Sequence, residues 1–250
     1  MTHLELQDDG VMDAHTARLP HQAESRLLQA LLLCGAASSL LYAATDVLGG
    51  IRYGGYSFAS QAISELAAFG APSKSLVDPL FRLYGVLALA FATGVVQSGA
   101  RGGRAMRITG VMLIGYALTG LLAPASSAMH RRGTATVATD LPHLVLTGLI
   151  VVWLLLAIIA GAMALGRRFR IYSFVTLLTA IVFGAATIPY AERLGAGKPT
   201  TGLGVIERID VYSMMLWLAV LSVALVRRRH DSEDVVVPLS DVESSRTIQV

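Results

Sequence analysis

The chain has 250 residues, of which 54% are hydrophobic and only 15% are charged. Soluble domains carry about 25% charged residues, so the composition excludes a water-soluble globule and predicts that lipid covers the apolar surplus. The formal net charge of +3 comes mostly from arginines at the ends of apolar runs, which is not the basic stripe of a nucleic-acid-binding protein, and the single cysteine, Cys34, excludes a disulfide framework.

Residues 1–26 form a polar segment of mixed charge that contains Pro20. The first apolar run begins after this segment and is too long for the apolar region of a signal peptide. We therefore expect no cleavable signal peptide, and we expect residues 1–26 to be a disordered cytoplasmic tail.

Six apolar segments follow between residues 27 and 226. A helix needs about 20 apolar residues to cross the hydrocarbon core, and none of the segments alternates as the strands of a membrane barrel would. The predicted fold class is therefore all-α, a polytopic membrane protein whose domain, residues 27–226, has six transmembrane helices. Glycines inside them, such as Gly110, Gly115 and Gly161, predict close helix packing. The predicted spans are residues 27–48, 80–100, 106–125, 141–165, 171–190 and 209–226.

The density of arginine predicts the orientation of these spans. The connections "GARGGRAMR" and "GRRFR" are short and basic, and the last span ends in "RRRH". The other connections, residues 49–79, 126–140 and 191–208, are longer and less densely basic. We therefore expect both termini in the cytoplasm and the three long connections on the outer face of the membrane.

The first long connection contains the stretch "SQAISELAAFGAP", residues 60–72. Gln61 and Glu65 are four residues apart and share one face of a helix, whereas Ile63 and Leu66 fall on the other face. The pattern predicts a short amphipathic helix whose polar face turns inward, because Glu65 against lipid would cost several kcal/mol. Glu65 either pins the loop by pairing with an arginine or backbone amides, or belongs to a functional site.

The stretch "MHRRGTATVATDLPHLV" holds a second polar cluster at the start of the fourth span. Thr139 or Asp140 can cap that helix, whereas His143, inside its first turn, needs a polar partner. His130 lies ten residues before Asp140. Together with Glu65, these histidines and Asp140 form an acceptable ligand set for zinc, and one carboxylate–imidazole pair could relay protons. No tight motif such as HExxH is present, so we predict no cofactor and keep zinc as the alternative.

The stretch "GLGVIERIDVY" places Glu207, Arg208 and Asp210 at the entry to the sixth span. Glu207 and Arg208 do not face each other as helix neighbours. Arg208 is instead expected to reach Glu65 or Asp140, which predicts a charge network that locks the outer loops. The same layer holds Asp46 and, as an interfacial aromatic belt, Tyr53, Tyr56, Tyr190 and Tyr212.

The chain ends in "DSEDVVVPLSDVESSRTIQV" after the basic end of the last span. This segment is polar and acidic and carries few aromatic residues, a composition typical of disorder. We therefore expect residues 227–250 to be a second disordered cytoplasmic tail.

Three stretches together resemble a known family. They are "YSFASQAISELAAFGAP", the "H…D…H" pattern of the loop before the fourth span and the start of that span, and "GLGVIERI". Over about residues 27–226 they resemble the bacterial integral-membrane family catalogued as domain of unknown function 998. Ser64 and Glu65 match its Ile-Ser-Glu-Leu motif, and Glu207 and Arg208 match its final motif more loosely. The resemblance implies a six-helix protein of the bacterial plasma membrane, without implying an activity, substrate or cofactor.

The chain is also distantly similar to the alkaline ceramidase and adiponectin-receptor hydrolases. Those hydrolases combine Ser, Asp and three His around zinc inside a helix bundle. Neither the fifth nor the sixth span of this chain contains a histidine. This departure removes most of the support for a zinc amidase.

Three functions remain open. The first is a non-catalytic membrane protein that binds a lipid or small amphiphile, or an envelope partner, through an outer-facing polar pocket. The second is a hydrolase acting on lipid at the outer leaflet, with His143 or Glu65 as base and a metal or Ser64 assisting. The third is a proton-coupled transporter, which is weakest because the middle of each span lacks charge. The candidate polar site comprises Ser64, Glu65, His130, Asp140, His143, Glu207 and Arg208.

Overall fold

The computed structural model describes residues 9–126, 128–134 and 136–246 of the chain. Within these residues every regular element is a helix. The elements, in chain order, are α1 (Asp9–Arg52), η1 (Ile63–Ala67), α2 (Lys74–Gly102), α3 (Arg104–Ser126), α4 (Leu141–Ala164), α5 (Arg167–Thr187), α6 (Tyr190–Gly195) and α7 (Leu203–Arg246). Of these, η1 is a 3-10 helix.

Six of the described helices are long and apolar enough to cross a membrane, which confirms the predicted all-α fold with six spans. The fifth span ends earlier than predicted, at Thr187 instead of Tyr190. Pro189 interrupts the helix there because proline has no backbone N–H, and the short helix α6 begins after it. The spans are Glu24–Arg52, Lys74–Ala100, Arg104–Leu122, Leu141–Ala164, Arg167–Thr187 and Leu203–Arg229.

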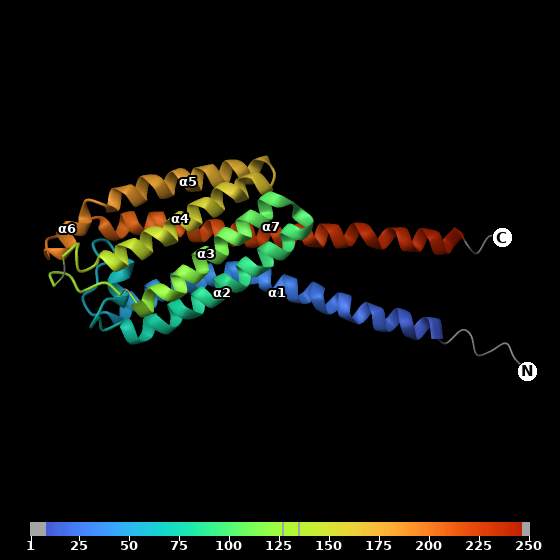
Figure 1. Ribbon diagram of the computed structural model, residues 1–250, viewed down its shortest axis with the longest axis horizontal. Coiled ribbons are helices and arrows are strands. Elements are labelled where there is room, and N and C mark those ends of the chain that lie inside the picture. Colours follow the sequence, from blue (N-terminus) through green and yellow to red (C-terminus); the bar gives the residue numbers. More distant parts are fainter. Residues whose placement is uncertain (1–8, 127, 135, 247–250) are drawn as a thin grey trace, which may run out of the picture.

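The six long helices pack as a ring of neighbours. Each contacts the next along the chain, α5 contacts α7, and α7 closes the ring against α1. The helices run along the long axis of the molecule, with both termini at the same end (Figure 1). We call this end, which also holds the α2–α3 and α4–α5 turns, the terminal end. The opposite end, with η1, α6 and the connections 53–73, 128–140 and 188–202, is the loop end.

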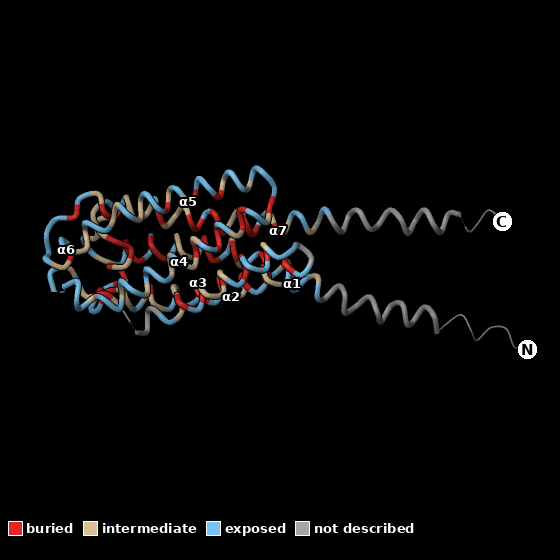
Figure 2. Tube along the Cα trace, turned by 45° about the horizontal axis from the view of Figure 1, so that its top comes forward, coloured by how far each residue is buried: buried red, intermediate tan, exposed pale blue. Residues whose placement is uncertain are grey.

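The core lies between the inward faces of the helices (Figure 2). Trp217 of α7 is fully buried there and its indole N–H donates to Ser173 Oγ over 2.9 Å. Large apolar side chains on the outward faces are exposed instead, such as Leu178 at 63% and Val145 at 59%. An apolar outer surface with a packed interior is what a bundle solvated by lipid requires.

Glycines let these helices approach closely, as predicted. A Cβ atom at Gly161 would lie 2.7 Å from the Trp217 ring, and one at Gly115 would lie 2.7 Å from the Trp153 ring. Real Cβ atoms do not come that close, so these positions accept only glycine without a shift of the neighbouring ring. Small residues serve this purpose in membrane bundles because lipid gives helices no hydrophobic reason to associate.

The helices at both termini extend beyond the membrane spans, α1 from Asp9 and α7 to Arg246. They therefore run into residues 1–26 and 227–250, the two segments that the sequence predicts to be disordered. Residues 1–8 and 247–250 lie outside the described part of the chain. The disorder of both tails stays a prediction.

Candidate functional site at the loop end

Glu65 lies on η1, the five-residue 3-10 helix that stands where the sequence predicts an amphipathic helix. Its side chain is 4% exposed and is held from two sides. The guanidinium of Arg132 donates to it twice, Nη2 to Oε1 over 2.7 Å and Nε to Oε2 over 3.2 Å. The backbone N–H of Ala62 donates to Oε1 over 2.9 Å, and Gln61 Nε2 donates to Oε2 over 3.3 Å. Of the two interpretations of Glu65, the structure therefore shows the pairing with an arginine.

Arg132 joins the three connections of the loop end through one guanidinium. Beside Glu65 in the first connection, it donates from Nη2 to the Ser60 carbonyl over 3.3 Å. Nη1 donates to Thr200 Oγ1 over 2.7 Å and to the Lys198 carbonyl over 3.3 Å in the third connection. The Thr200 hydroxyl in turn donates to the Ser60 carbonyl over 2.7 Å. The planar fork of arginine suits this role because it presents five donors in fixed directions.

A second ion pair lies at the entry to α7. Arg208 donates to both carboxylate oxygens of Asp46 on α1, Nη2 to Oδ1 over 2.7 Å and Nε to Oδ2 over 2.9 Å. The expectation that Arg208 reaches Glu65 or Asp140 is therefore wrong, because α7 packs against α1 and brings Arg208 to Asp46. Asp46 is fully buried. Arg208 Nη1 also donates to the carbonyls of Phe58, Gln61 and Gly204.

Two of the tyrosines predicted as interfacial belt residues contact this second pair. The Tyr212 hydroxyl donates to Asp46 Oδ2 over 2.5 Å. The Tyr56 hydroxyl accepts from Arg208 Nη2 over 2.9 Å and donates to the Ala62 carbonyl over 2.8 Å. Burial raises the pKa of the Tyr56 phenol, so the phenol keeps the proton that it donates.

Glu207 supports η1 from α7. Its Oε2 accepts the backbone N–H of Ile63, the first residue of the 3-10 helix, over 2.8 Å. This bond satisfies one of the amides that a helix start leaves without an internal partner. Ser64 lies half-buried on η1 between Ile63 and Glu65. The stretches "ISEL" and "VIER", which lie far apart in the sequence and both contribute to the family resemblance, thus meet at η1.

His130 and Asp140 form a third contact in the connection between α3 and α4. His130 Nδ1 lies 2.6 Å from Asp140 Oδ1, and the His130 backbone N–H donates to the same oxygen over 3.0 Å. Asp140 stands at the N-cap position of α4 but makes no side-chain cap bond, so the predicted capping role is wrong. Its carboxylate turns back to His130 instead. Thr139 does not cap α4 either, because its hydroxyl bonds to the backbone of Thr136.

The four possible zinc ligands are not gathered into one site. In the part of the chain that the structure describes, no group of three or more His, Cys, Asp or Glu side chains could hold a metal ion. Glu65 is engaged by Arg132, His130 and Asp140 contact each other, and His143 is half-buried in the first turn of α4. The residues present therefore do not fit a zinc centre.

Asp210, like Glu207, forms no ion pair with any described residue, but unlike Glu207 it is almost completely buried. It is 8% exposed, and its Oδ1 is buried with no hydrogen-bond partner among the described residues. Gly184 of α5 faces it, so that a Cβ there would lie 3.4 Å from Asp210 Oδ2. The sequence predicts Asp210 as one of the charges that lock the outer loops, and Asp210 is not among the predicted residues of the candidate polar site. Its three-residue spacing from Glu207, on an otherwise apolar helix face, is the signal that could have singled it out.

Comparison with known proteins adds a family but no activity. A family model described as "Protein of unknown function (DUF998)" matches residues 36–224. No curated protein and no solved structure matches the chain. The matched residues include all or part of each of the six spans. They also include the stretches "ISEL" and "VIER" that meet at η1.

Proposed function

The chain belongs to the DUF998 family and is itself a multi-pass membrane protein with six candidate spans, and we propose that it is a non-catalytic binder of a cationic amphiphile at the loop end. The binding group is the buried carboxylate of Asp210, with Glu207 beside it. We further propose that the protein lies in a bacterial plasma membrane, with the loop end outside and both termini in the cytoplasm.

The observation that carries this proposal is the charge balance of the loop end. Glu65 and Asp46 each face a guanidinium, whereas no ion pair in the described part of the chain reaches Asp210 or Glu207. Asp210 also lies inside the span Leu203–Arg229. A carboxylate without a partner at that depth costs several kcal/mol. A bound cation removes this cost, and an ammonium group also supplies the missing hydrogen-bond donors.

The surroundings of Asp210 favour a cation attached to an apolar chain. Glu207 lies one helical turn away on the same face of α7 and is half-buried. Gly184 presents only backbone to Asp210, and two exposed isoleucines flank it, Ile181 of α5 at 52% and Ile188 just after the end of α5 at 71%. An amine headgroup can therefore sit at the carboxylates while its hydrocarbon stays against lipid-facing side chains.

The two alternative functions find less support. Glu65 cannot serve as the base of a hydrolase while both of its oxygens bind Arg132. The His130–Asp140 pair is the one contact that favours proton transfer, but no described contact links it to Ser64. A transporter needs an ionisable group near the middle of a span, whereas Asp210 lies two turns from the start of α7. Both functions stay predictions.

The test is a titration of the full-length protein in phosphatidylcholine nanodiscs with dodecylamine, using dodecanol and dodecanoic acid as controls of equal chain length. Dodecylamine alone should raise the unfolding temperature, by about 5 °C near saturation, because a molecule that binds only the folded state stabilises it. Asp210→Asn should abolish this shift and, by removing an uncompensated charge, raise the unfolding temperature without amine. Glu192→Gln, which alters an exposed carboxylate of α6, should leave the shift unchanged.

Two results would overturn the proposal. In the first, dodecylamine and dodecanol stabilise the wild-type protein equally, which would assign the effect to the hydrocarbon chain. In the second, the amine effect persists in Asp210→Asn. Hydrolysis of an added lipid ester by the wild-type protein, lost in Asp140→Asn, would instead establish the hydrolase.

A further inference from the structure

The terminal end carries an open groove where α2 meets α3. Its volume is about 560 Å³, and its walls include Gly99, Arg104, Arg107, Ile108 and Val111. The two helices touch through backbone there, because a Cβ at Gly99 would lie 2.6 Å from the Arg107 nitrogen. At Gly103, by contrast, a Cβ would meet nothing within 4 Å, so the space beside the α2–α3 turn is open.

The mouth of this groove carries unbalanced positive charge. Arg104 and Arg107 lie in the first turn of α3, and both are exposed. No acidic residue stands in that turn, and none lines the groove. The start of a helix already carries partial positive charge, so two arginines there repel it and favour a bound anion. Apart from backbone bonds, such as that from the Arg107 N–H to the Gly103 carbonyl, neither arginine makes a hydrogen bond or ion pair with any described residue.

The rest of the groove is apolar. Ile108 and Val111 follow Arg104 and Arg107 at three- and four-residue spacings and therefore lie on the same side of α3. They are 39% and 48% exposed, within the membrane span Arg104–Leu122. The surface thus changes from cationic to apolar over about 10 Å of helix, in the direction that leads into the bilayer.

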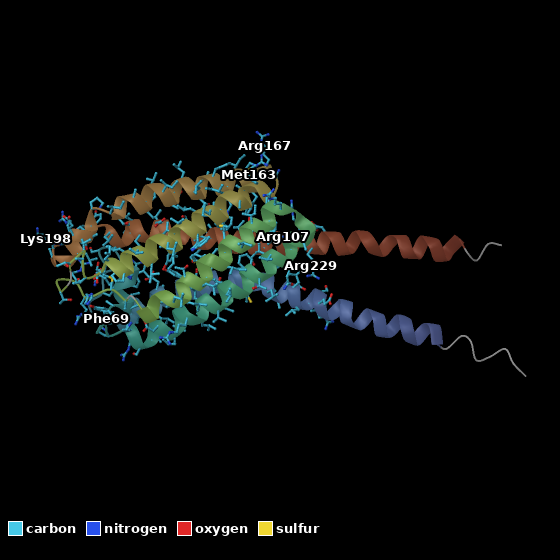
Figure 3. All side chains as sticks on the ribbon, in the orientation of Figure 1. Phe69, Arg107, Met163, Arg167, Lys198 and Arg229 are labelled. Atoms are coloured by element: carbon cyan, nitrogen blue, oxygen red, sulfur yellow. The ribbon has the colours of Figure 1, made fainter. Side chains whose placement is uncertain are left out.

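We propose that this groove binds an anionic phospholipid. The phosphate lies at Arg104 and Arg107, and the upper part of an acyl chain lies along Ile108 and Val111. A basic pocket between helices at the membrane surface recognises lipid headgroups in this way. The site is separate from the amphiphile site at the loop end, since the two lie at opposite ends of the bundle; Figure 3 labels Arg107 at the terminal end and Lys198 at the loop end.

Native mass spectrometry of the full-length protein, released from mixed micelles of phosphatidylglycerol and phosphatidylcholine, tests this site. The wild-type protein should retain phosphatidylglycerol in preference to phosphatidylcholine. The double variant Arg104→Gln/Arg107→Gln should lower phosphatidylglycerol affinity about 30-fold, since one arginine at a membrane surface contributes about fivefold. The control Arg167→Gln/Arg168→Gln removes two exposed arginines from the α4–α5 turn at the same end and should leave that affinity within about twofold of wild type.

A variant that leaves the charge unchanged separates binding in the groove from general electrostatic attraction to the lipid. Val111→Trp fills the apolar part without altering any charge and should also weaken retention of phosphatidylglycerol. If the control double variant loses as much affinity as Arg104→Gln/Arg107→Gln, the arginines act only through net charge and the proposal is wrong. Equal retention of phosphatidylglycerol by Val111→Trp and wild type would likewise show that the groove is not the binding site. Arg104→Gln alone, with an expected fivefold loss, carries the test if the double variant does not fold.

Discussion

Glu65 and Asp46 are almost completely withdrawn from water, and each depends on one arginine. Their side chains are 4% and 1% exposed. Removing one member of a buried ion pair strands the other charge, which costs about 3–5 kcal/mol, whereas an exposed pair contributes about 1 kcal/mol or less. Lys74 and Asp78 form a half-buried i,i+4 pair, whose carboxylate at 17% exposure is less withdrawn from water than those of Glu65 and Asp46. An ion pair therefore contributes more to stability at Glu65 and Asp46 than at Asp78.

Glu65→Gln should lower the free energy of unfolding by about 2–3 kcal/mol. The value is below that of a fully buried pair because the Arg132 side chain is 24% exposed. The amide keeps one acceptor for Arg132 but leaves its charge uncompensated. Thermal unfolding of the purified protein in detergent measures the change.

Asp78→Asn is the matched control for this variant, since it neutralises a carboxylate of the same end in an i,i+4 pair. Its expected effect is below about 1 kcal/mol. Similar small losses in both variants would show that Arg132 does not hold the three connections together.

The residues of the loop end could be predicted from the sequence, but their partners could not. An acidic residue inside an apolar run indicates a polar partner in any membrane protein, which singled out Glu65 at once. Arg132, its partner, stands 67 residues away, and Asp46 stands 162 residues from Arg208. Which arginine meets which carboxylate depends on the contact of α7 with α1 and on the course of the loops. Local sequence spacing gives no information about that helix contact or about the course of the loops.

At the scale of the elements, the length of η1 is set by a contact with a distant residue and not by the local sequence pattern. The sequence spacing favours a longer amphipathic helix, yet the helix ends at Ala67. The Phe69 backbone N–H donates to the Met129 carbonyl of another connection over 2.9 Å, so it is not available to continue a helix. The six spans were predictable because about 20 consecutive apolar residues need no partner to be recognised.

Two glycines of α3 differ in how closely a neighbouring helix approaches them. A Cβ at Gly110 would lie 2.6 Å from the backbone nitrogen of Val96, whereas one at Gly120 would meet nothing within 4 Å. Backbone cannot rotate away as a side chain can. The substitution Gly110→Ala must therefore separate the two helices.

Gly110→Ala should destabilise the protein by about 1–3 kcal/mol, the usual cost of overpacking. Gly120→Ala should be neutral or stabilising by up to about 1 kcal/mol, because alanine is the better helix former. Thermal unfolding of the two variants measures the difference, which cancels any effect of helix propensity common to both. Equal behaviour of the two would mean that α2 and α3 lie farther apart than described.

At the scale of the whole molecule, the ring of helices separates two chemically different ends. The loop end is tied by ion pairs between its connections, and the terminal end has short turns rich in exposed arginine. Arginine is retained on the cytoplasmic side during insertion. The same residues that form the lipid groove beside α3 therefore also favour its placement at the inner leaflet.

Cysteine labelling tests this orientation directly. In a Cys34→Ala background, Lys198→Cys places a thiol on the loop end and Arg167→Cys places one on the terminal end (Figure 3). Both native side chains are exposed, so both thiols are open to reagent. A membrane-impermeant maleimide should label Lys198→Cys in intact cells and Arg167→Cys only after the membrane is opened, because the positive-inside rule keeps the arginine-rich turns in the cytoplasm. The reverse pattern would place the Asp210 site inside the cell, where an amphiphile in the outer leaflet could not reach it.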